Sequence, residues 1–154
     1  MRRLIIVVPG PPPPEANPNR SGGHWGGKVK AMGPWRDSVF LQAVNARNLW
    51  EWSRKEKGGL YISWPPLARA TITVTFTVPD HRYEMDDQNT YSAMKEAVDE
   101  LTMPSERKNK RGAAILLDDA PENLTWTKPV WKVVKGLERR DMTTTIEIRE
   151  VADV

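Results

Sequence analysis

The residues of this chain best suited to chemistry are aspartates in two groups, with a lysine between them. The first group begins at Asp86, and the second is the adjacent pair Asp118 and Asp119. Lys95 lies six residues beyond Asn89, on nearly the same face as the expected helix start. Carboxylates bind Mg²⁺, which activates water and neutralises charge during phosphodiester hydrolysis. We predict that Asp86, with Asp119 or Asp118, holds a metal and that Lys95 contacts a phosphate oxygen.

Each of these residues also has an ordinary structural explanation. An aspartate before a helix commonly serves as its cap, and a lysine on an amphipathic helix is commonly only solvated. The sequence Asp118-Asp119-Ala120-Pro121 is typical of a turn. For any one position the structural explanation is the better one, whereas the three positions together favour a site.

Two expected elements position the acidic group that begins at Asp86. Thr71 to Val78 alternates threonine with apolar residues, which predicts a strand with one buried face that ends at Pro79. From Asn89 to Leu101 the apolar spacing predicts a helix, with Asp87 or a neighbour as its cap. The inward positions of this helix are expected to be Tyr91, Met94, Val98 and Leu101.

The rest of the chain predicts further strands, one helix and two flexible loops. A helix is expected from Gly33-Pro34, with Trp35, Val39, Ala43, Ala46 and Trp50 on its apolar face and Gly58-Gly59 at its end. The expected loops lie near 10–32 and 103–113. The expected strands are Leu4 to Val8, Trp126 to Val134 and Thr143 to Ile148, the last two paired in a hairpin. The order β-α-β-α-β-β predicts one α+β domain over residues 1–154, a mixed sheet with helices on one face.

Composition and charge limit the partners of this protein. Its 154 residues suit a single core, and no apolar run approaches the length of a membrane span. There is no cysteine, which excludes disulfides and thiolate metal sites and fits the cytoplasm. The segment from Arg107 to Arg111 holds four cations in five residues, so it is either a solvated loop or an arm that contacts DNA phosphates.

Three segments, taken in order, resemble the RusA family of Holliday junction resolvases, and in particular its phage-type members. The segment from Ile6 to Asn17 is similar to that family's strand, Gly/Pro turn and Asn. The segment from Asp86 to Leu101, with its four-residue step from Lys95 to Asp99, is similar to the family's Asp-x-Asp-Asn, Lys and Asp-Gly-Leu pattern. Leu117-Asp118-Asp119 is similar to its closing acidic pair. The resemblance runs almost from one end of the chain to the other.

The resemblance implies a RusA-like fold and a homodimer that binds four-way DNA junctions and cuts symmetric strands with Mg²⁺, or with Mn²⁺ in its place. Asp86 matches the first metal-binding Asp, Lys95 the catalytic Lys and Asp119 the late metal-binding Asp, with Asp118 beside it. Asn89 matches the Asn of the motif. The expected DNA contacts are Arg82, Asn89, Arg107, Lys108, Lys110 and Arg111.

The chain departs from the family pattern at Gln88, where the motif has its second Asp. A glutamine carbonyl can bind a metal but brings no charge, so metal affinity should weaken. Asp87 replaces the missing acid if the local backbone shifts by one residue. A register that uses Glu84 and Asp86 is also open, at the cost of the Asn89 match.

We therefore expect a Mg²⁺-dependent, structure-selective endodeoxyribonuclease that resolves four-way junctions by paired phosphodiester hydrolysis. Its expected location is the cytoplasm of a bacterial host, without a membrane or small-molecule cofactor. A second hypothesis is a catalytically weak protein of the same fold that binds branched DNA. A third is an interaction protein unrelated to DNA, which would lack the steep salt dependence that phosphate contacts produce.

Overall fold

One mixed β-sheet forms the centre of the computed structural model, which describes residues 1–17, 25–55, 62–108 and 110–152. Within that part of the chain the strand order is β1-β5-β2-β3, and β4 also pairs with β2. β1 and β5 are antiparallel, as are β2 and β5, whereas β3 and β4 both run parallel to β2. The strands are β1 (Arg3–Pro9), β2 (Ala70–Val78), β3 (Leu124–Trp126), β4 (Val130–Val133) and β5 (Thr143–Glu150).

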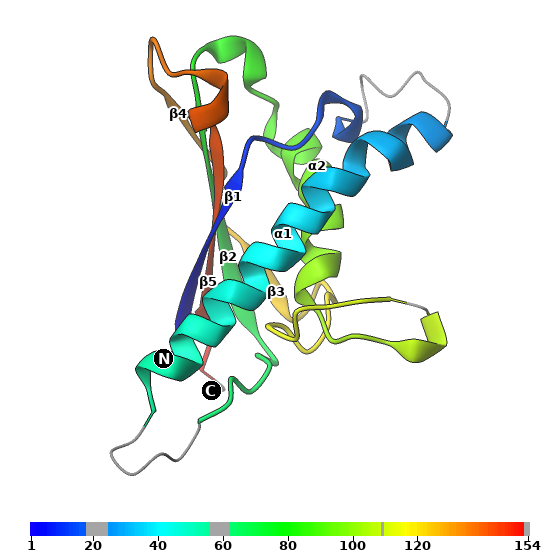
Figure 1. Ribbon diagram of the computed structural model, residues 1–154, viewed down its shortest axis with the longest axis vertical. Helices are drawn as coiled ribbons and strands as arrows, with labels where there is room; N and C mark the ends of the chain where they lie inside the picture. Colours follow the sequence, from blue (N-terminus) through cyan, green and yellow to red (C-terminus); the bar gives the residue numbers. More distant parts are fainter. Residues whose placement is uncertain (18–24, 56–61, 109, 153–154) are drawn as a thin grey trace.

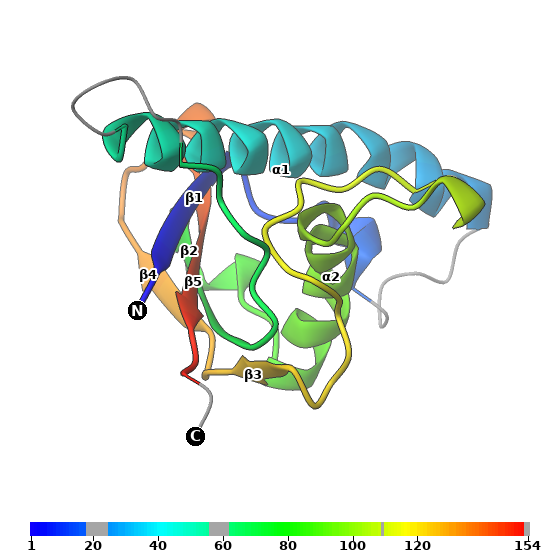
Figure 2. The same ribbon diagram turned by 90° about the horizontal axis from the view of Figure 1, so that it is seen from below.

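Two α-helices lie on the same side of this sheet (Figures 1 and 2). They are α1 (Trp25–Ser53), which packs along β1, and α2 (Asp87–Leu101), which packs against α1. Short 3-10 turns are η1 (Pro14–Ala16), η2 (His81–Tyr83), η3 (Glu106–Lys108) and η4 (Arg139–Asp141). Neither α1 nor any other helix among the described residues has the length and apolar character to cross a membrane.

Period-two alternation explains why one face of the sheet is covered and the other is open. In β2 the apolar side chains are buried and the intervening threonines are half-buried. β1 and β5 alternate in the same way, so their apolar side chains meet the helices in one core. The α+β class, with a mixed sheet and helices on one face, is therefore confirmed.

The first helix begins earlier than the sequence predicts. The sequence predicts a loop up to residue 32 and a helix start at Gly33-Pro34, but the stretch from Trp25 is helical and Pro34 lies inside α1. A proline within a helix removes one backbone hydrogen bond. Met32, just before it, is buried in the core at 3% exposure, so tertiary packing offsets that loss. Trp35, Val39 and Ala43 are buried as predicted.

The predicted hairpin between the last two strands is wrong. The stretch expected as one strand from Trp126 is divided into β3 and β4, with Pro129 between them. β4 pairs with the C-terminal part of β2, and β5 pairs with the other edge of β2. β2 therefore lies between the two strands that were expected to be neighbours.

Candidate active site on helix α2

Asp86 is the N-cap of α2. One of its carboxylate oxygens accepts a hydrogen bond from the backbone N–H of Asn89, and the other accepts one from Asn89 Nδ2, each at 2.8 Å. Both partners are among the predicted site residues, but their side chains bind each other. Asp87 and Gln88 follow in the first turn and are exposed, where the charge of Asp87 favours the positive end of the helix.

Asp118 and Asp119 follow the segment that covers the C-terminal end of α2. Asp118 Oδ1 accepts hydrogen bonds from the backbone N–H of Ala120 at 3.1 Å and from Asn123 Nδ2 at 3.0 Å. The carboxylate of Asp118 thus stabilises a turn, as the structural explanation predicts. Asp119 is exposed.

The segment before Asp119 is held at the end of α2 that carries Asp99, because the backbone N–H groups of Ile115 and Leu116 donate to the carbonyl oxygen of Leu101. The negative charge of Asp119 acts on the carboxylate of Asp99. Asp86 precedes Asp99 by 13 residues, which corresponds to about 20 Å along a helix. Two carboxylates that share one Mg²⁺ each lie about 2 Å from the ion. The structure therefore does not bring Asp86 and Asp119 to one ion, and a metal-binding role for Asp86 remains only a prediction.

Lys95 and Asp99 lie on one polar stripe of α2. Gln88, Ser92, Lys95 and Asp99 recur at spacings of four, three and four residues, so they occupy one face of the helix. Lys95 is exposed and forms no ion pair with any described residue. The expectation that Lys95 shares a face with Asn89 is wrong, because six residues of helix correspond to about 120° of rotation and about 9 Å of rise from it.

The surroundings of Asp99 raise the pKa of its carboxyl group. Partial burial raises the pKa of Asp99, and the charges of Asp119 and Glu96 raise it further, while Lys110 and Arg36 act in the opposite direction. The nearest of these cations is Lys110, whose Nζ lies 3.6 Å from Asp99 Oδ1. No role was predicted for Asp99, although its four-residue step from Lys95 was a signal that both face the same way.

The basic loop between α2 and Ala113 is tied to the body of the protein. Ser105 and Lys110 exchange backbone hydrogen bonds of 2.8 and 2.9 Å across it. At its base Gly112 lies so close to α2 that a Cβ there would be 2.0 Å from the carbonyl oxygen of Thr102, so no other residue fits. The loop therefore projects from a fixed base.

The four cations of this loop differ in their availability to a ligand. The Arg111 guanidinium donates to Glu100 at 2.8 Å and to Asp37 at 2.6 Å, and it lies over the ring of Phe40 at 4.8 Å. These hydrogen bonds, that to Glu100 above all, raise the pKa of Arg111. Lys110 is paired with Asp99. Arg107 and Lys108 are exposed and form no ion pair with described residues, so they are the cations best placed for DNA.

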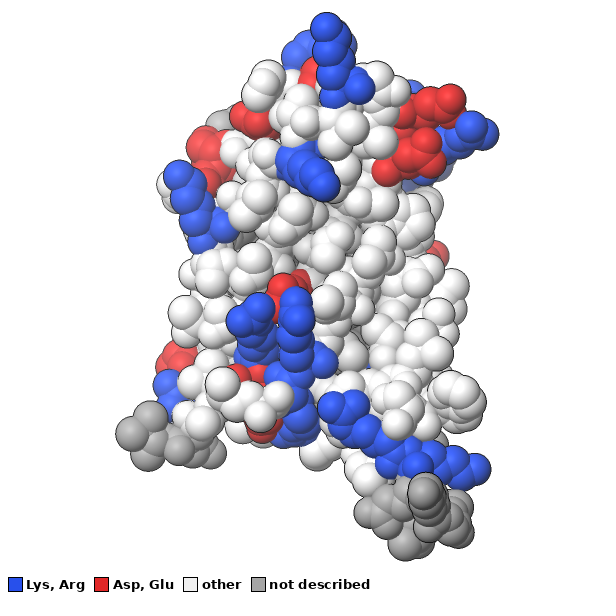
Figure 3. Space-filling view, turned by 90° about the vertical axis from the view of Figure 1, so that its left-hand side faces the viewer, with Lys and Arg blue, Asp and Glu red and all other residues white. Residues whose placement is uncertain are grey.

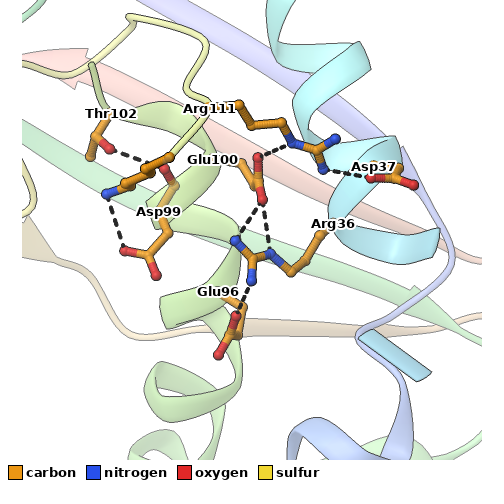
Figure 4. Close-up of polar contacts among 8 residues, drawn as sticks. Arg36, Asp37, Glu96, Asp99, Glu100, Thr102 and Arg111 are labelled. Atoms are coloured by element: carbon orange, nitrogen blue, oxygen red, sulfur yellow. Dashed lines mark hydrogen bonds and ion pairs between the residues drawn. The ribbon is translucent and has the colours of Figure 1, made fainter. Parts of the chain in front are cut away.

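Glu100 connects this loop to both helices (Figure 4). Its side chain is only 2% exposed, and its two oxygens accept from different arginines. Arg36 of α1 donates to one oxygen and reaches Glu96 at 2.9 Å, while Arg111 of the loop donates to the other. Charge-assisted hydrogen bonds from two sides satisfy the buried carboxylate.

Arg82, the remaining predicted DNA contact, lies in η2 at the other end of α2. It donates to both oxygens of Asp80, at 3.2 and 2.9 Å, and these hydrogen bonds lower the pKa of Asp80. Arg82 also lines a cavity of about 720 Å³ together with Asn17 and the turn that begins at Gly10. The first resembling segment is thus close to the residues that precede Asp86.

The donor set fits a divalent cation that keeps most of its water. No cluster of three acidic, histidine or cysteine residues capable of holding a metal occurs within the described ranges. Asp99 and Asp119 supply two hard oxygen ligands whose mutual repulsion a cation would relieve. Mg²⁺ is commonly held by only one or two carboxylates, with waters and substrate oxygens as its other ligands.

Comparison with protein-family models and with curated proteins found no match for this chain.

Proposed function

We propose that this protein is a Mg²⁺-dependent endodeoxyribonuclease that cuts four-way DNA junctions, as the resemblance to the RusA family implies. The observation that carries the proposal is the pair Asp99 and Asp119. These carboxylates come from separate elements that the backbone hydrogen bonds of Ile115 and Leu116 to Leu101 hold together, and Asp99 is partly removed from water. Two such acids beside a strip of cations are suited to holding a metal against a phosphodiester.

The residues around this pair have distinct roles in the proposal. Asp99 and Asp119 would hold Mg²⁺, which would supply Lewis acidity and an activated water. Lys95, one turn before Asp99 on the same face of α2, would contact a non-bridging phosphate oxygen. Arg107 and Lys108 supply charge for the DNA backbone. Two other predicted site residues have structural roles instead. Asp118 accepts a hydrogen bond from the backbone N–H of Ala120, and the side chain of Asn89 donates one to Asp86.

We propose that the protein acts as a homodimer, because two matched sites suit the two symmetric strands of a junction. Its proposed location is the bacterial cytoplasm. The open face of the sheet supports a second copy as partner (Figure 3). Figure 3 shows a largely uncharged area above a cluster of charged side chains on this face, and Ile5 and Val7 of β1 and Val130 of β4 are about half exposed. Exposed apolar area of this kind is typical of an interface.

Cleavage of a synthetic four-way junction in Mg²⁺ tests the proposal. Asp119→Asn should abolish cutting and leave junction binding intact or stronger, because a negative charge beside DNA is removed. Asp118→Asn is the matched comparison, since its amide oxygen can still accept from Ala120 and Asn123. Cutting that survives in Asp119→Asn, or that is lost only in Asp118→Asn, would contradict the assignment of Asp119.

A second candidate is a protein of the same fold that binds branched DNA without cutting it. Two observations favour it: the absence of a three-acid cluster among the described residues, and the use of Asp86 as a helix cap. It predicts salt-dependent junction binding and no cleavage in either Mg²⁺ or Mn²⁺ at excess protein.

A further inference from the structure

A groove separates the N-terminal half of α1 from the basic loop. It has a volume of about 940 Å³, and its walls come from two parts of the chain that are far apart in sequence. One wall is the face of α1 that carries Lys28, Met32 and Arg36, at helical spacing. The other wall includes Lys108 and Lys110 of the loop, and Glu96 and Glu100 of α2 lie between the walls.

The acids of α2 in this groove are paired with arginines, whereas a lysine on each wall is not paired. Its two acids on α2 are neutralised by guanidinium groups: Glu100 binds Arg36 and Arg111, and Glu96 binds Arg36. Lys28 and Lys108, on opposite walls, form no ion pair with any described residue. A ligand that enters the groove therefore meets available cations on both sides. Three of the four acids in its lining are paired with arginines, and only Glu106 of the loop has no ion pair among the described residues.

One wall of the groove lies beside Asp99. Lys110 lines the groove, and its Nζ is 3.6 Å from Asp99 Oδ1. A phosphate bound at Lys110 would therefore be close to Asp99, one of the two proposed metal ligands. The base of the loop is held by the close packing of Gly112 and by the two backbone hydrogen bonds between Ser105 and Lys110. The base of this wall is therefore already ordered before a ligand binds, which lowers the entropy cost of binding.

We propose that this groove holds the sugar-phosphate backbone of one DNA arm next to the strand that is cut. Lys28 contacts phosphate from the α1 wall, and Lys108 contacts it from the loop wall. The inference rests on the proposed function and adds α1 to the DNA-binding surface. The sequence offered no reason to expect this, since Lys28 falls in a stretch that was predicted to be a loop.

Charge reversal on the two walls tests the groove. The double variant Lys28→Glu, Lys108→Glu should weaken binding to a four-way junction and lower the salt slope by roughly 0.9 for each lost phosphate contact. The matched control is Lys128→Glu with Lys135→Glu, which makes the same change in net charge at exposed positions before and after β4. Far-UV circular dichroism and thermal unfolding verify that each variant folds.

The outcomes separate the groove from the proposed function. If the unmodified protein does not bind DNA even at low salt, the proposed function fails. If it binds DNA and the control pair loses as much affinity and slope as the groove pair, the groove is not the site. The groove pair should also weaken binding to a linear duplex by a similar factor, because an arm is ordinary duplex. A loss confined to the junction would overturn the assignment to an arm.

Cross-linking supplies a second measurement that does not depend on affinity. The chain has no cysteine, so one introduced at 28, 108 or 132 is the only thiol. A junction that carries a disulfide-activated tether on the phosphates of one arm should cross-link to the variants Lys28→Cys and Lys108→Cys. It should not cross-link to Lys132→Cys. Equal cross-linking at all three positions, or none at 28 and 108 on DNA that is bound, would overturn the proposal.

Discussion

Asp99 and Glu100 are adjacent carboxylates on α2 with opposite surroundings. Glu100 is almost completely buried, yet each of its oxygens receives hydrogen bonds from an arginine. Asp99 is only partly buried, but its nearest cation is at 3.6 Å and a second carboxylate acts on it. Burial by itself therefore does not mark the reactive group. The carboxylate with one long ion pair, Asp99, is the one suited to a metal, and the carboxylate held by two arginines, Glu100, stabilises the structure.

The largest effect on stability is expected at Glu100. Glu100→Gln should lower the free energy of unfolding by about 3 kcal/mol, since removing one member of a buried ion pair leaves two arginines without their shared partner. Urea unfolding at pH 7 measures this loss. Glu96→Gln is the control, because Glu96 is partly exposed and pairs only with Arg36, so its loss should be about 1 kcal/mol or less. Equal losses of stability in the two variants would show that Glu100 contributes no more to the fold than Glu96.

The neighbouring change at Asp99 should have the opposite sign. Asp99→Asn should leave the free energy of unfolding unchanged or raise it by up to about 1 kcal/mol, because it removes a charge that burial and Asp119 disfavour. It should also abolish junction cutting. Unfolding and cleavage measured on the same preparation test both parts. A variant that is less stable and still cuts would show that Asp99 is a structural residue.

The pH dependence of stability sharpens the comparison. The folded-state pKa of Asp99 is raised above its reference value of 3.8, so ionised Asp99 opposes folding at neutral pH. This penalty should disappear as the pH falls through the raised pKa toward 3.8. The difference between the protein and Asp99→Asn should thus shrink between pH 7 and pH 3.8. A protein that is more stable than Asp99→Asn at pH 7 and loses this advantage on acidification would mean that Lys110 dominates the surroundings of Asp99.

The smallest effect is expected at a carboxylate far from α2. Glu150 of β5 binds Arg2 through both oxygens, at 2.6 and 3.1 Å, and these hydrogen bonds lower its pKa to about 2. Its stabilisation is present above pH 4.5 and should be lost as the pH falls through about 2, the reverse of Asp99. Glu150→Gln should cost about 1 kcal/mol or less at pH 7, since the pair is partly exposed. Thermal unfolding of this variant at pH 7 and pH 2 measures the change.

The strands and the second helix were predictable because their signals are local. Alternating threonine and apolar residues define β2 by themselves, and Asp86 caps α2 within three residues of the chain. The pairing of β4 with β2 was not predictable, because the contact joins residues about 55 apart and no local turn fixes it. The start of α1 was missed because buried Met32 and its tertiary contacts stabilise a stretch that contains Pro34.

The sequence by itself determined the class of the fold, the two acidic segments and the basic loop, since periodicity, caps and charge are properties of neighbouring residues. Only the tertiary structure decided which acids meet. Helix geometry separates Asp86 from the C-terminal end of α2, and the chain that covers this end, with Leu116 bonded to Leu101, carries Asp119 toward the end where Asp99 lies. The tertiary structure also decided which cations are available to a ligand, because Arg111 forms an ion pair with Glu100 and Lys108 forms none with the described residues. Long-range packing sets these partners, and one sequence does not encode it in any local pattern.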